Sequence, residues 1–245
     1  MMNIYIGTSG YQYKDWYRDF YPADLPKQRW LEYYASKFNT IEINNSFYRL
    51  PDTKTFAKWR DETPDGFVFS IKGSRYITHQ LRMREPEGPV GRIFERAAVL
   101  GPKLGVVLWQ FPESLSQQLE RLEAFCAVLA RHPVAREVRQ AFEFRHPSWF
   151  ADDTYALLER YNHALVISQS PVWPVVEVAT ASWSYARFHG PGALYSSGYS
   201  DEQLADWASR LRRLTRDDIF GYFNNDAGNF APWNALKLRE LLERA

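Results

Sequence analysis

The feature that most constrains the fold is an alternation, repeated eight times in 245 residues, between short apolar runs and longer segments. Runs such as Asn3–Thr8, Phe67–Lys72 and Gly105–Phe111 have the length and composition of buried strands. The segments between them, such as Leu115–Arg131, carry apolar residues at helical spacing. Alternation of this kind predicts a parallel sheet. Eight such units on this length predict a closed α/β barrel of the (β/α)8 TIM type, which typically takes about 250 residues.

One connection breaks the pattern. The sixth strand is predicted over Ala164–Ser168. The segment after it, Gln169–Ala181, contains two prolines and has no helical period, so the helix expected there is missing or irregular. No Gly/Ser-rich linker interrupts the chain elsewhere. We therefore expect residues 1–245 to form a single TIM-barrel domain.

Composition excludes several classes of function. The net charge of +1 argues against a partner held by charge over the whole surface, so nucleic acid is not favoured. The chain has one cysteine, Cys126, and therefore no intramolecular disulfide, and it shows neither a signal peptide nor a membrane span. These features predict a cytoplasmic protein without a membrane partner. The absence of GxGxxG, P-loop and GxSxG motifs argues against hydride transfer on a nucleotide-binding fold.

The stretch Gln140–Trp149 points to a functional site. In a strand over Gln140–Arg145, Glu143 and Arg145 share one face and two phenylalanines take the other. Burying an acid and a guanidinium in a strand costs desolvation free energy unless the two charges pair or bind a ligand. His146 and Trp149 follow directly, which gathers four chemically useful side chains at one strand end.

Other strands of the predicted barrel also end in polar residues. The outer face of each strand is covered by helices and needs apolar side chains, so polar residues of the opposite parity point inward, toward the mouth. The residues predicted to share this cavity are Glu42, Asn44, Lys72, Gln110, Glu143, Arg145, Arg187, His189 and Asn224. Further candidate substrate-binding residues at strand ends and in loops are Thr8, Ser9, His79, His146, Trp149 and Asn225.

Candidate roles follow from the residue types. Glu42 and Glu143 are the candidate general acid and base, and His189 and His79 are alternative proton carriers. Two acids against three basic residues give the mouth a positive charge, which favours a phosphate or carboxylate ligand. The structural alternative is a salt-bridge lattice that fills the barrel without performing chemistry.

No cofactor is predicted. A divalent metal held by Glu42, Glu143, His189 and a loop histidine is a minor alternative, since no two histidines have ligand spacing. Aromatic residues that could wall the cavity, or simply wedge the loops together, are Tyr13, Trp16, Tyr48 and Trp149.

With these residues in view, the chain resembles the DUF72 family, the YecE-like proteins, nearly from end to end. The blocks that carry the resemblance are Gly7-Thr8-Ser9-Gly10, Phe38–Asn44, Phe67–Lys72, Gln110-Phe111-Pro112, Phe142–Trp149, Arg187–Gly190 and Tyr222–Asp226. Two positions depart from the pattern. Glu113 stands where a second proline is expected, and Ser168-Gln169-Ser170 stands where an acid is expected.

The resemblance implies an eight-stranded TIM-type barrel but no reaction, because the family is functionally uncharacterised. Its barrel is similar in outline to endonuclease IV, which suggests DNA binding at the level of fold analogy. The metal-ligand histidines expected of that enzyme are missing here.

Three hypotheses remain open. The first is an enzyme, of hydrolase or isomerase/lyase type, in which Lys72, Arg145 and Arg187 hold a small anionic substrate and Glu143 or Glu42 moves a proton. The second is a nucleic-acid binder or endonuclease IV-like repair enzyme. The third is a non-catalytic scaffold barrel.

Overall fold

The computed structural model describes residues 2–244 and contains eight strands in one parallel sheet, in the order β1-β8-β7-β6-β5-β4-β3-β2. The strands are β1 Ile4–Thr8, β2 Thr40–Ile43, β3 Val68–Lys72, β4 Leu104–Gln110, β5 Arg139–Glu143, β6 Ala164–Gln169, β7 Ser184–Phe188 and β8 Ile219–Phe223. The TIM-type barrel predicted from the alternation is therefore confirmed.

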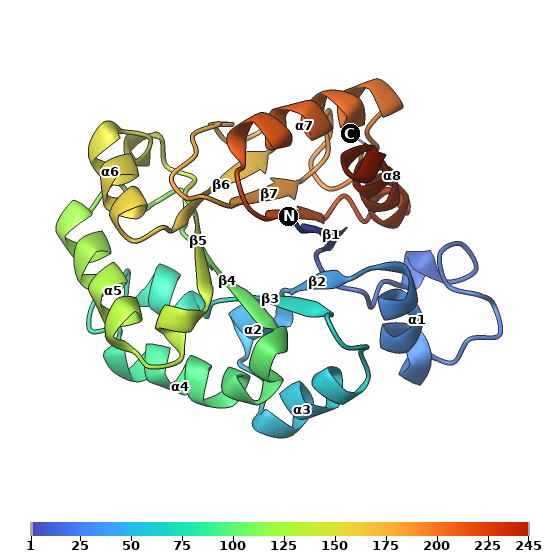
Figure 1. Cartoon of the computed structure of the whole chain (residues 1–245), viewed down its shortest axis with the longest axis horizontal. Helices are drawn as coiled ribbons and strands as arrows, with labels where there is room; N and C mark the ends of the chain where they lie inside the picture. The colour runs from blue at the N-terminus through green and yellow to red at the C-terminus, as the bar shows by residue number, and fades with distance from the viewer. Residues whose placement is uncertain (1, 245) are drawn as a thin grey trace.

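Helices surround the strands (Figure 1). They are α1 Trp30–Lys37, α2 Asn45–Tyr48, α3 Thr53–Asp61, α4 Glu87–Ala97, α5 Leu119–Arg131, α6 Asp152–Arg160, α7 Asp201–Leu214 and α8 Phe230–Arg244. The chain between β6 and β7 contains no helix, as its prolines predicted. Within residues 2–244, no helix has the length and apolar character needed to cross a membrane.

The helix expected from Leu115 begins instead at Leu119. Tertiary hydrogen bonds hold the preceding residues out of the helix: the carbonyl of Leu115 accepts from Trp149 Nε1 at 2.7 Å, and the amide of Gln117 donates to Ser148 Oγ at 2.8 Å. These partners lie more than thirty residues away, so local spacing could not reveal them.

The seam between β1 and β2 closes the barrel without a regular ladder. A single bridge joins Ser9 to Glu42, where the amide of Gly10 donates to the Glu42 carbonyl at 2.8 Å. Lower down, the hydroxyl of Tyr34 from α1 accepts from the Thr8 amide at 2.9 Å and lies 3.1 Å from the Thr40 carbonyl, to which it donates. A tyrosine hydroxyl therefore stands between the two strands where direct backbone bonds would otherwise be.

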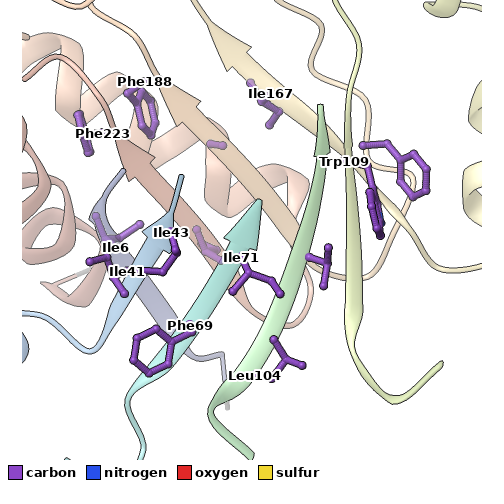
Figure 2. Packing of buried hydrophobic residues seen from close by; sticks show 14 of the residues in the cluster. Ile6, Ile41, Ile43, Phe69, Ile71, Leu104, Trp109, Ile167, Phe188 and Phe223 are labelled. Carbon is purple, nitrogen blue, oxygen red and sulfur yellow. The ribbon is translucent and has the colours of Figure 1, made fainter. Parts of the chain in front are cut away.

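Two apolar layers flank the strands. The larger lies between strands and helices, and Figure 2 shows part of it, with Ile6, Ile43 and Phe188 among the labelled side chains. The smaller fills the inside of the barrel and includes Val106, Leu108, Ala141, Val166, Tyr185, Phe220 and Tyr222. Because side chains alternate along a strand, the residues that continue the inner rows past this plug are directed toward the mouth.

Candidate functional site

An ionic layer lies directly above the inner plug, centred on Arg187 of β7. Its Nη2 and Nε bond the Oε1 and Oε2 atoms of Glu42, from β2, at 2.8 and 3.1 Å. Its Nη1 bonds Oε2 of Glu143, from β5, at 2.6 Å. Both glutamates are fully buried and Arg187 is 2% exposed. Three strands distant in sequence therefore meet through one guanidinium.

Neutral groups complete the environment of Glu42. Ser9 Oγ donates to its Oε1 at 2.5 Å, and the Tyr185 hydroxyl donates to its Oε2 at 2.6 Å. The Tyr185 hydroxyl in turn lies 2.7 Å from Ser70 Oγ. With these bonds and the fork from Arg187, both oxygens of Glu42 are engaged twice, which leaves it little capacity to take part in proton transfer.

Charge holds Glu143 in its ionised form. Burial alone would raise the pKa of this carboxyl, but the guanidinium groups of Arg187 and Arg145 hold the pKa well below its ordinary value. Burial would likewise lower the pKa of Arg187, yet Glu42 and Glu143 raise it further above the ordinary range. Glu143 and Arg187 are therefore both charged at physiological pH.

A cavity of about 260 Å³ opens above this layer. Its walls come from the carboxyl ends of several strands and from the loops that follow them. The residues that line it are Tyr13, Asn44, Tyr48, Lys72, Arg145, Arg187, Tyr195, Asn224 and Asp226. The sequence prediction that strand-end polar residues converge on one cavity is thus correct for Asn44, Lys72, Arg145, Arg187 and Asn224.

Lys72, the last residue of β3, presents an amine without a polar partner. Its Nζ lies 4.3 Å from the centroid of the Phe47 ring, and within residues 2–244 it makes neither an ion pair nor a hydrogen bond. Burial, reinforced by the positive charge of Arg187, lowers the pKa of Lys72 to about 7. A substantial fraction of this lysine is therefore neutral near pH 7.

Arg145 forms the cationic wall of the cavity. Its Nε bonds Oε1 of Glu143 at 3.1 Å, and its guanidinium lies 3.6 Å from the ring centroid of Trp173. Trp173 Nε1 donates to the carboxylate of Glu113. Within the part of the chain that the structure describes, Nε is the only paired nitrogen of Arg145, so its two terminal nitrogens are available to an anion.

The opposite wall offers unpaired acceptors. Among the described residues, no hydrogen-bond partner reaches Oδ1 of Asn44, Asn224 or Asp226, although all three atoms are buried. Burial raises the pKa of Asp226 to about 8, and the nearby Tyr13 hydroxyl opposes the rise only in part. Asp226 is therefore protonated at neutral pH and can donate a proton.

His189 follows β7 directly and does not line the cavity. Its Nε2 is 3.2 Å from Ser168 Oγ, and the ring edges of Trp173 and Tyr195 pack against it at 5.3 and 5.7 Å. Burial, together with the charge of Arg187, lowers its pKa to about 3, so the imidazole stays neutral. Its Nδ1 has no partner within residues 2–244.

The structure corrects the placement of two residues and decides that of a third. Thr8 faces α1, where its Oγ1 lies 3.0 Å from the Tyr34 hydroxyl, because it has the outward parity of β1. Trp149 stacks on Phe144 at 4.3 Å in the outer core. Trp16 is fully buried in the same core. Thr8 and Trp149 therefore do not reach the mouth, against the prediction that they bind substrate. Trp16 follows the packing alternative, whereas Tyr13 and Tyr48 line the cavity.

Four other predicted binding residues lie near the mouth but outside the cavity lining. Gln110 Nε2 donates to the Phe111 carbonyl at 3.0 Å, and Asn225 Nδ2 donates to the Ser197 carbonyl at 2.9 Å. His146 Nδ1 lies 2.8 Å from Ser148 Oγ within its own loop. The ring of His79 packs edge-on against Phe47 at 5.0 Å. These contacts support the loops around the mouth.

Sequence reasoning missed two residues that shape the site, Trp173 and Tyr195, and gave no role to two others, Tyr185 and Asp226. Trp173 and Tyr195 lie in segments without strand or helix period, where position carries no directional information. Strand parity places Tyr185 on the same face of β7 as Arg187, two residues before it, but does not reveal its bond to Glu42. Asp226 closes the Asn-Asn-Asp run after β8.

The minor metal alternative receives no support from the geometry. Residues 2–244 contain no cluster of three or more histidine, cysteine, aspartate or glutamate side chains arranged to hold a metal ion. Arg187 occupies the position between Glu42 and Glu143 where a cation would otherwise bridge them.

The eight parallel strands, with charged side chains gathered at their carboxyl ends, define a TIM-barrel protein with a polar mouth. The family described as "Protein of unknown function DUF72" matches residues 5–245, and the chain belongs to this family.

Relatives share most of the chain. The UPF0759 protein YunF of Bacillus subtilis is 28% identical over 98% of this chain and 95% of its own length. The UPF0759 protein YecE of Escherichia coli K12 is 31% identical over 60% of this chain and 50% of its own. The crystal structure of a DUF72 family protein from Thermotoga maritima aligns with this chain at a TM-score of 0.86 and 28% identity. The alignment covers 98% of this chain and 99% of the Thermotoga protein. SacUVDE, at 12% identity and a TM-score of 0.57, shares the fold alone.

Proposed function

We propose that the mouth binds a small molecule that carries both an anionic group and hydroxyl groups, and that it performs acid–base chemistry on that molecule. The observation that carries the proposal is the set of unsatisfied groups around one cavity. Arg145 offers unpaired donors on one side, and three buried oxygens lack donors on the other. Unpaired buried polar groups are costly unless a ligand satisfies them.

The ligand chemistry follows from these groups. The two terminal nitrogens of Arg145 suit a phosphate or carboxylate, which a guanidinium binds through paired hydrogen bonds. The acceptors on Asn44, Asn224 and Asp226 suit hydroxyl donors. A sugar phosphate or a sugar acid has both features. The cavity volume of about 260 Å³ fits a ligand of a few carbon atoms with one anionic group.

The acid–base roles that the sequence suggested for Glu42 and Glu143 are assigned here to Lys72 and Asp226. Arg187 and neighbouring groups occupy the carboxylate oxygens of Glu42 and Glu143, and neither glutamate lines the cavity. The two glutamates instead hold Arg187 in place. Lys72 and Asp226 line the cavity itself. Near pH 7 the amine is partly neutral and the carboxyl is protonated, which is the pairing a base and an acid require.

A thermal-shift titration with glycerol 3-phosphate tests the binding. The melting temperature of the protein is expected to rise with ligand concentration. Arg145→Met should weaken the affinity by about tenfold or more, since hydrogen bonds to charged groups contribute about 1.5–3 kcal/mol. The matched control is Arg75→Met, which removes an exposed arginine outside the cavity lining and should leave the affinity unchanged.

Two outcomes would contradict the proposal. One is an affinity for glycerol 3-phosphate that Arg145→Met does not change. The other is stabilisation by a single-stranded oligonucleotide but by none of the small anions, which would favour the nucleic-acid hypothesis instead.

A further inference from the structure

The half-buried Lys72 differs from the buried Lys103 in what surrounds its amine. Lys103 is 9% exposed, and its Nζ donates to the carbonyls of Arg60 and Thr63 at 2.7 and 2.6 Å and to Thr63 Oγ1 at 3.2 Å. Lys72 Nζ has an aromatic ring for a neighbour and, within residues 2–244, no acceptor. An amine without acceptors keeps its lone pair available as soon as it loses a proton.

The cavity brings two further groups to the same space as this amine. Arg145 presents its unpaired terminal nitrogens, and Asp226 presents an oxygen without a donor. They come from the loops after β5 and β8, whereas Lys72 ends β3. A ligand held at Arg145 by its anionic group therefore lies in a cavity that also contains a nucleophile and an acid.

We propose that Lys72 is a nucleophile that forms an imine with an aldehyde or ketone carrying a phosphate or carboxylate. This inference rests on the proposed function, because it needs the anionic group to be held at Arg145. Beyond the proposed function, the ligand also carries a carbonyl group, and the reaction forms a covalent bond between that group and Lys72.

The reaction balances without any other reagent. The nitrogen lone pair of Lys72 attacks the carbonyl carbon, a C–N bond forms, and the carbonyl π electrons move to oxygen. That oxygen takes the proton of the Asp226 carboxyl, and a further proton passes from nitrogen to the same oxygen, which leaves as water. Amine, carbonyl and carboxylic acid thus become an iminium ion, water and a carboxylate, with no change in oxidation state.

The charges around Lys72 suit this product. The carboxylates of Glu143 and Glu42 favour a positive charge at its nitrogen, whereas burial and Arg187 disfavour it. These effects leave the pKa of Lys72 at about 7, so the amine is neutral often enough to attack and the iminium still has anionic neighbours.

Reductive trapping tests the proposal. The protein is incubated with dihydroxyacetone phosphate and sodium cyanoborohydride at pH 7.5, and the modified lysines are located by peptide mass spectrometry. Lys72 is expected to be labelled about tenfold faster than exposed Lys54 or partnered Lys103, as an activated nucleophile should be. Glycerol 3-phosphate, which lacks the carbonyl, should compete with the labelling.

The outcomes separate this inference from the proposed function. Stabilisation by glycerol 3-phosphate together with labelling of Lys72 no faster than Lys54 overturns the imine and leaves the binding site intact. Labelling spread evenly over the exposed lysines overturns the imine whether or not the site binds anions. Selective labelling of Lys72 that glycerol 3-phosphate does not reduce also overturns it, since the ligand would then not be held at Arg145.

Two variants keep the test independent of folding. Lys72→Met removes the amine while keeping a chain of similar length, and its thermal melt reports whether the barrel is intact. Asp226→Asn retains Lys72 but removes the acid. It should slow the labelling about a hundredfold, the lower end of the typical contribution of general acid catalysis, without preventing it.

Discussion

Arg187 binds both carboxylate oxygens of Glu42, with Nη2 to Oε1 at 2.8 Å and Nε to Oε2 at 3.1 Å, although 145 residues separate them. The remaining terminal nitrogen, Nη1, bonds Glu143. Glu42 and Glu143, two of the four residues predicted from the sequence to carry protons, therefore support the mouth instead. The groups left free to meet a ligand are those on the cavity wall.

Removing Arg187 should destabilise the barrel strongly. Arg187→Met leaves two buried carboxylates without their shared cation, and breaking a buried ion pair costs about 3–5 kcal/mol. Urea unfolding at pH 7 measures the loss. The exposed pair Arg160–Glu123 supplies the control, because Arg160→Met should change the free energy of unfolding by about 1 kcal/mol at most. Equal losses in the two variants would refute the buried network as a source of stability.

Asp226→Asn should stabilise the protein above neutral pH. In the folded chain the carboxyl has a pKa of about 8, against an ordinary value of 3.8, so folding opposes its ionisation. Below pH 4 the group is protonated in both states and contributes nothing. The penalty grows as the pH rises toward 8 and is constant beyond. Free energies of unfolding measured between pH 4 and 9 should therefore diverge, with the variant the more stable by a few kcal/mol at the upper end, at about 1.4 kcal/mol per pKa unit.

The control for this experiment is Asp24→Asn, which changes an aspartate at an exposed position. Curves for Asp226→Asn and the unmodified protein that stay parallel over the whole range would show that Asp226 is ionised in the fold.

Lys72→Met should show the opposite dependence on pH. Folding lowers the pKa of this amine from 10.5 to about 7, so below pH 7 the folded state carries the full penalty of a buried charge. As the pH rises from 7 toward 10.5, the folded amine is neutral while the unfolded one still binds a proton, and stability increases. Lys72→Met should therefore be more stable than the unmodified chain at pH 7, and the advantage should shrink toward pH 10.

Lys103→Met provides the contrast for that measurement. It removes a donor from three oxygen acceptors, so it should destabilise the fold at neutral pH instead of stabilising it. If Lys72→Met also destabilises at pH 7, the amine has partners in solution that the structure does not show.

Tyr34→Phe should loosen the seam between β1 and β2. The hydroxyl of Tyr34 is the acceptor for the Thr8 amide and a donor to the Thr40 carbonyl, and the loss leaves both buried groups unpaired. We expect a cost of about 1–3 kcal/mol in the free energy of unfolding. Hydrogen exchange at the Thr8 amide should accelerate by more than exchange at Val107 in the central strand β4. Unchanged protection of Thr8 would mean that another group closes the seam.

The sequence by itself determined the architecture and the parity of the strands. Eight alternating units on 245 residues predict the barrel, and the two prolines before β7 predict the missing helix. The two-residue period of a strand placed Glu42, Glu143 and Arg187 on the inner face, because the outer face must meet helices. Each of these inferences depends on local spacing, which a sequence displays directly.

Only the tertiary structure decided which inner residues pair and which remain free. That outcome depends on how far neighbouring strands are staggered when the sheet closes, and the stagger brings Arg187 level with two glutamates on strands far away in sequence. It also depends on irregular loops, which carry Trp173 onto Arg145 and Asp226 to the cavity wall without any periodic signal. A repeating spacing fixes the face on which a side chain lies, but its partners are set by contacts between segments that the spacing does not describe.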